Sequence, residues 1–130
     1  MLIILQRFAL KAKFINMAIP PEIAVLIDQL NQELNWTERE ATEGLNLTRS
    51  LLSRFPNNVV LIQFFASLGN ILIFVESYRR RIQLTVEPLL PVNVPTEIIQ
   101  DAGEELATML GVVLEVKINA SRLKTDLENL

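Results

Sequence analysis

Apolar residues recur at alternating intervals of three and four along the C-terminal part of the chain, from Thr96 to Leu130. This spacing keeps the apolar side chains on one helix face and is typical of a helix that packs along its length in a coiled-coil manner. The β-branched stretch 112–118 is also compatible with a strand, but the period continues through it. We therefore predict one helix over 96–130, with Thr96 as its N-cap. The seam consists of Ile99, Ala102, Leu106, Met109, Val113, Val116, Ala120, Leu123, Leu127 and Leu130.

A second seam with the same spacing begins after Pro21, a residue type favoured in the first turn of a helix. Its middle is small or polar, which indicates either a close helix crossing or a break. The segment 37–40 has the form of a capping box, but the seven-residue phase continues across it, so one helix over 21–55 is predicted. The seam consists of Ile23, Ile27, Leu30, Leu34, Thr37, Ala41, Gly44, Thr48, Leu51 and Phe55.

A third helix is predicted over 58–86, with Asn58 as its cap. Its segment 59–75 contains no charged residue and is soon followed by three arginines, a combination that also fits a membrane span. Polar residues recur every seven positions at Gln63, Asn70 and Ser77, and lipid offers such groups nothing to bond. We therefore expect a nearly buried helix in a water-exposed bundle. Three prolines in 87–95 predict a mostly extended connector.

These elements predict an all-α fold of three long helices, a helical hairpin plus a C-terminal helix, in a single domain over residues 17–130. The helix over 58–86 is apolar on more faces than two neighbours would cover, which favours a dimeric bundle. The apolar seam of the C-terminal helix is the expected interface, together with two large aromatic residues. The interface residues are Ile99, Leu106, Met109, Val113, Val116, Leu123, Leu127, Trp36 and Tyr78.

Residues 1–16 form a basic, apolar N-terminal segment with no acidic residue. In a secretory signal the positive charges precede the apolar run, whereas here the apolar run comes first. A basic amphipathic segment can lie on a membrane surface or on a partner. The favoured interpretation is an extension that precedes the real start at Met17, which leads directly into the proline-initiated helix.

Composition narrows the chemistry available to the chain. The 130 residues include no cysteine and no histidine and carry a net charge of −3. The commonest general base and the commonest transition-metal ligand are therefore absent, and no cofactor is expected. A mildly acidic chain has no general attraction for nucleic acid. The lack of cysteine fits a reducing cytoplasm, which is the expected location.

Carboxylate pairs are the one candidate for a metal site. Glu40 and Glu43 stand three residues apart on one predicted helix, and Asp101 and Glu104 do so on another. Residues at that spacing share a helix face, so two facing helices can offer oxygen ligands to Mg²⁺. The arrangement resembles the acidic pairs of helical nucleoside triphosphate pyrophosphatases, and this resemblance implies a magnesium-dependent nucleotide hydrolase. The lysines and the phosphate-binding context of those enzymes are not evident.

Arg79, Arg80 and Arg81 form the densest basic run outside the N-terminal segment. Such a run can bind an anion or an acidic partner, and it can also simply complement the dipole at the C-terminal end of its helix. Consecutive residues point in different directions around a helix, which argues against a single patch. No catalytic residue is predicted. The leading hypothesis is a non-enzymatic helical interaction module, a scaffold, adaptor or assembly factor; a magnesium-dependent hydrolase and a small membrane-associated protein are the alternatives.

Overall fold

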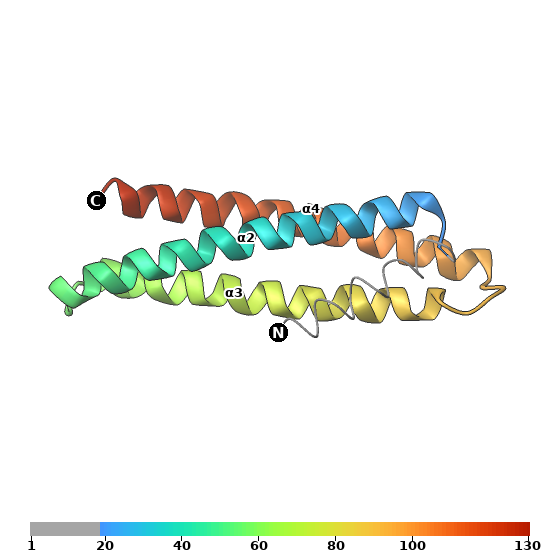
Figure 1. The fold of residues 1–130 in the computed structure, drawn as a ribbon, viewed down its shortest axis with the longest axis horizontal. Helices are drawn as coiled ribbons and strands as arrows, with labels where there is room; N and C mark the ends of the chain where they lie inside the picture. The colour runs from blue at the N-terminus through green and yellow to red at the C-terminus, as the bar shows by residue number, and fades with distance from the viewer. Residues whose placement is uncertain (1–18) are drawn as a thin grey trace.

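The computed structural model describes residues 19–130, which form three long helices and one short helical turn (Figure 1). Helix α2 spans Pro21–Arg54, α3 spans Val59–Val86, the 3₁₀ turn η1 spans Glu87–Leu89, and α4 spans Thr96–Glu128. No strand occurs in this part of the chain, so the predicted all-α class is confirmed. The predictions for residues 1–16 lie outside the described residues.

Helices α2 and α4 run in the same direction, and α3 runs antiparallel to both (Figure 1). Two ion pairs mark the parallel register, because Glu33 contacts Lys117 at 2.6 Å and Glu40 contacts Lys124 at 2.8 Å. The two pairs are thus one seven-residue step apart on both helices. Contacts are most extensive between α2 and α4 and least extensive between α3 and α4. As a result, α3 packs mainly against α2 and is the least enclosed of the three helices.

The helix ends follow local chemistry that the sequence partly predicts. Pro21 occupies the first turn of α2, and the side chain of Asn58 accepts a hydrogen bond from the backbone N–H of Leu61 at 3.1 Å. Thr96 was predicted to cap α4 but is its first helical residue, with Pro95 before it and no side-chain cap. The carbonyl of Pro95 accepts the first backbone bonds, from Ile98 and Ile99, which places Pro95 at the N-cap.

The connector between α3 and α4 differs from the extended segment that was predicted. It begins with the 3₁₀ turn η1, in which Leu89 is buried. Pro88 occupies an early position of that turn, where a missing backbone N–H removes no hydrogen bond. Asn93 has a left-handed backbone with φ of 66°, a conformation that asparagine tolerates better than most residues. The chain thus reverses direction while keeping one apolar anchor in the core.

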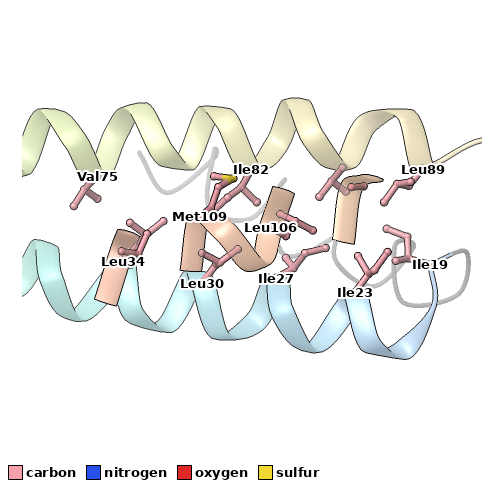
Figure 2. Close-up of a cluster of buried hydrophobic side chains, with 13 residues drawn as sticks. Ile19, Ile23, Ile27, Leu30, Leu34, Val75, Ile82, Leu89, Leu106 and Met109 are labelled. Carbon is pink, nitrogen blue, oxygen red and sulfur yellow. The ribbon is translucent and has the colours of Figure 1, made fainter. Parts of the chain in front are cut away.

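The larger core cluster fills the end of the bundle that contains the start of α2. Figure 2 shows side chains of α2 and α3 pointing toward one another, with Leu106 and Met109 of α4 between them. A smaller cluster fills the other end and includes Leu68 and Leu127. The residues of the larger cluster are Ile19, Ile23, Ile27, Leu30, Leu34, Val75, Ile82, Val86, Leu89, Ala102, Leu106, Met109 and Val113.

The small and polar middle of the α2 seam is a continuous helix with a close crossing. Thr37 and Thr48 are fully buried, and each hydroxyl donates to the backbone carbonyl four residues earlier at 2.7 Å. These bonds satisfy the hydroxyls inside α2, so burial leaves no unpaired donor. The capping-box form of 37–40 therefore does not restart the helix, as the seven-residue phase predicted.

Candidate interaction surface

Helix α3 leaves a strip of apolar side chains uncovered along the bundle. Val59, Ile62 and Ile73 are 65 %, 49 % and 66 % exposed, whereas Leu61, Leu68 and Val75 on the opposite side of the helix are buried. Ala66 and Gly69 lie between the exposed residues at the same helical spacing. We call Val59, Ile62, Ala66, Gly69 and Ile73 the outer α3 face.

The exposure of α3 corrects the prediction that this helix is nearly buried. By length and composition, Val59–Leu89 is long and apolar enough to cross a membrane, and only 22 % of its most apolar 18-residue window is buried in the chain. Gln63, Asn70 and Ser77 are exposed, as their seven-residue recurrence predicted. The apolar strip beside them is exposed as well, because α3 has one extensive neighbour, α2, and only a thin contact with α4.

The predicted interface on α4 is largely the core of the bundle. Leu106, Met109, Val113 and Leu127 are at most 2 % exposed, and they pack within the two core clusters. Ile99, Val116 and Leu123 are half-buried against the same clusters. Within the single chain, α2 and α3 cover this seam, so these residues make their main contacts in the core.

The two aromatic residues predicted at the interface differ in their surroundings. Trp36 is 41 % exposed, and Arg39 and Lys117 lie 4.7 and 5.5 Å from the centre of its ring. Cations at these distances are attracted to the face of the indole ring. Tyr78 is half-buried and stacks on Phe74 with ring centres 4.1 Å apart. Tyr78 therefore belongs to the edge of the core, and Trp36 to a charged surface formed by α2 and α4.

The three consecutive arginines do not form one patch. Arg79 pairs with Glu38 and Glu76 and donates to the side chain of Asn35 at 2.9 Å, which ties α3 to α2. Arg81 pairs with Glu105 on α4 at 3.2 Å. Arg80 is exposed and has no ion-pair partner within residues 19–130. Two of the three guanidinium groups are thus structural links between helices.

The four candidate metal-ligating carboxylates are not brought together. Glu40 and Glu43 both contact the ammonium of Lys124, which lies 23 positions after Asp101 on α4. A separation of that size corresponds to about 35 Å along a helix. Asp101 and Glu104 lie instead near the start of α4. Within residues 19–130, no group of three or more acidic side chains is placed to hold a metal ion.

Lys124 is the centre of the most highly charged cluster that the structure describes. Hydrogen bonds to Glu40 and Glu43 hold the pKa of Lys124 well above its ordinary value of 10.5. The same contact lowers the pKa of Glu43 below 4.5. The two carboxylates therefore share one ammonium, and a cation brought between them would first have to displace Lys124.

An open groove of about 410 Å³ lies between the end of α3 and the start of α4. Its charged side chains include Arg81 and Glu105, which are already paired with one another. Leu84 and Ile98 contribute exposed apolar surface, 60 % and 43 %. The groove thus combines one ion pair with exposed apolar surface.

A scan against protein-family models, a search of the curated proteins and a search of the solved structures each gave no match.

Proposed function

We propose that the protein is a non-enzymatic helical interaction module, a scaffold, adaptor or assembly factor, whose outer α3 face binds another protein. The observation that carries this proposal is the apolar exposure of α3. Three large hydrophobic side chains of this face, Val59, Ile62 and Ile73, are 65 %, 49 % and 66 % exposed, and the small apolar residues Ala66 and Gly69 lie between them. Contiguous apolar surface of this kind marks an interaction site, whereas single exposed hydrophobic residues need no explanation. A cytoplasmic location remains part of the proposal.

The rigid bundle behind this face supports a binding role. Leu68 and Val75 are fully buried on the inner side of α3 and fix the orientation of the helix. Arg79 adds a polar link to α2. Because α3 is already held in place, binding at its outer side chains requires little further loss of conformational entropy. This favours binding of another helix.

A membrane-associated protein is the second candidate, because the charge-free stretch of α3 suits lipid as well as protein. Full insertion of α3 would separate it from α2 and α4 or carry their charged residues into the bilayer. Loss of the contacts around Leu68, Val75 and Ile82 would also dismantle both core clusters. Association of the intact bundle with a lipid surface avoids both costs and is the form of this candidate that the fold permits.

The hydrolase hypothesis has the least support. It requires the carboxylates of α2 and α4 to converge on one ion, and Glu40 and Glu43 are about 35 Å along the bundle from Asp101.

Affinity capture from an extract of the host tests the proposed function. The tagged chain is compared with Ile73→Glu, which places a carboxylate on the outer α3 face. Ile118→Glu on α4 is the matched control, because Ile118 and Ile73 are 68 % and 66 % exposed. We expect a partner that the unaltered chain and Ile118→Glu retain and Ile73→Glu loses. Recovery of the same proteins by all three chains would reject the outer α3 face as the binding surface.

A further inference from the structure

Four of the five residues of the outer α3 face, all but Val59, have an order that matches a reversed copy of itself. Ile62, Ala66, Gly69 and Ile73 are spaced by four, three and four positions, and their sizes run large, small, small, large. Both the spacing and the sizes read the same from either end. If a second α3 lies antiparallel on this face, Ile62 meets the partner's Ile73 and Ala66 meets the partner's Gly69. A two-fold dimer requires a self-complementary surface of this type.

No contact within the described chain requires a glycine at position 69. A Cβ added at Gly69 would meet nothing within 4 Å, so no neighbour in the described chain requires the missing side chain. Glycine inside a helix lowers its stability relative to alanine, mainly through the entropy of the unfolded chain. Small residues where two helices cross allow their axes to approach closely. A crossing at Ala66 and Gly69 uses the space that the single chain leaves empty.

Charge is compatible with the same antiparallel register. Residues 59–75 contain no charged side chain, and Glu76, which this register sets opposite the partner's Val59, is already paired with Arg79.

The area of the outer α3 face indicates how tightly two copies are expected to bind. A stretch of 17 residues, 59–75, is about 25 Å long as a helix. A standard stable interface buries about 800 Å² on each partner, which is more than a strip of that length and one helix width provides. The contact is therefore expected to dissociate in the micromolar range, about 1 to 100 µM.

We propose that two copies of the chain associate through their outer α3 faces, with the two helices antiparallel and crossing at Ala66 and Gly69. This inference rests on the proposed function, since it identifies the partner of the same face as a second copy.

Disulfide cross-linking tests the register, because the chain contains no cysteine of its own. Ile62→Cys and Ile73→Cys are made as separate variants and oxidised alone and as a mixture. In the proposed dimer each cysteine lies about 16 Å along the helix from its own copy but opposite the other position. We expect a disulfide-linked dimer in the mixture and little in either variant alone. A mixture of Ile73→Cys with Ile118→Cys is the control and should not cross-link.

Two results would overturn the proposal. Cross-linking of Ile62→Cys alone at the rate of the mixture would show that the helices are parallel. An absence of cross-links in every mixture, with a monomeric unaltered chain at about 100 µM, would remove the dimer, and the capture experiment with Ile73→Glu would still decide the proposed function. In that case, flotation with vesicles of phosphatidylcholine and phosphatidylglycerol that Ile73→Glu abolishes would assign the face to a lipid surface instead.

Discussion

The side chain of Leu68 in α3 packs directly against Gly44 of α2 and leaves too little room for a Cβ at position 44. A Cβ added at Gly44 would lie 3.0 Å from Cδ1 and 3.3 Å from Cδ2 of Leu68. Leu68 is fully buried, so its side chain has little room to move away. This contact draws α3 onto α2 at the small middle of the α2 seam and sets which side of α3 faces inward.

Gly44→Ala is predicted to destabilise the protein by about 1 kcal/mol, because overpacking against Leu68 outweighs the gain in helix propensity. Gly111→Ala is the matched control, since a Cβ at Gly111 meets nothing within 4 Å. That substitution should stabilise α4 by about 0.5–1 kcal/mol. Urea unfolding of both variants gives the comparison, and equal stabilisation by the two alanines would mean that α2 and α3 are not in close contact at Gly44.

Leu106→Ala is predicted to lower the free energy of unfolding by about 2–5 kcal/mol, as expected for a leucine deleted from a closed core. Leu106 is fully buried, whereas Leu84 is 60 % exposed, so Leu84→Ala should change stability by about 0.5 kcal/mol or less. Thermal or urea unfolding at a concentration below dimer formation isolates the single chain. A small effect of Leu106→Ala would show that the α4 seam is not the core of one chain.

Lys124→Met is predicted to destabilise the protein at neutral pH, and the loss should shrink at both extremes of pH. The pKa of Glu43 is lowered in the folded state. Its contribution to the free energy of unfolding is therefore fully present above its ordinary pKa of 4.5 and is lost as the pH falls through the pKa of the folded state. The pKa of Lys124 is raised in the folded state. Its contribution to the free energy of unfolding is therefore fully present below its ordinary pKa of 10.5 and is lost as the pH rises through the pKa of the folded state.

Melting temperatures of the unaltered chain and Lys124→Met across the acid and alkaline ranges provide the test of that charge cluster. Lys117→Met is a useful comparison, because Lys117 contacts a single carboxylate, Glu33, at 2.6 Å. A difference between Lys124→Met and the unaltered chain that stays constant from pH 7 down to about pH 2, below the ordinary carboxylate range, would contradict the assigned contacts.

Magnesium is predicted to leave the melting temperature unchanged at millimolar concentration, for the unaltered chain and for Glu40→Gln alike. A bound ion stabilises the folded state in proportion to its occupancy. Glu40 and Glu43 are already paired with the ammonium of Lys124, and Asp101 lies near the opposite end of α4. A rise in melting temperature with magnesium that Glu40→Gln abolishes would restore the hydrolase hypothesis.

The periodicity of the sequence predicts the helices and the inward faces of α2 and α4 well. The seams from Ile23 to Thr48 and from Ala102 to Leu127 are buried or half-buried along most of their length, because a spacing of three and four leaves only one side on which the apolar residues can meet. The cap at Asn58 was likewise predicted from its residue type. Periodicity is thus sufficient to predict the inward face of a helix whose apolar residues lie on one side only.

Helix α3 is where local pattern fails. It is apolar on two sides, and periodicity does not decide whether the side of Leu68 or that of Ile73 turns inward. That choice depends on the fit of Leu68 against Gly44, a contact between residues 24 positions apart. The separation of Glu40 from Asp101 follows from the parallel direction of α2 and α4. A hairpin of the first two helices followed by a third helix that runs back already implies this parallel direction. The separation of the carboxylates could therefore have been predicted from the sequence.

Molar mass by light scattering across a concentration series tests the central claim most directly. The unaltered chain and Ile118→Glu should approach twice the monomer mass of 14.8 kDa as concentration rises, while Ile73→Glu stays at that mass. Two isoleucines leave an apolar contact and two carboxylates enter it, so the dissociation constant should rise by about 100-fold or more. A monomeric mass for the unaltered chain throughout the series, or the same mass curve for Ile73→Glu, would contradict the assignment of the outer α3 face as a dimer interface.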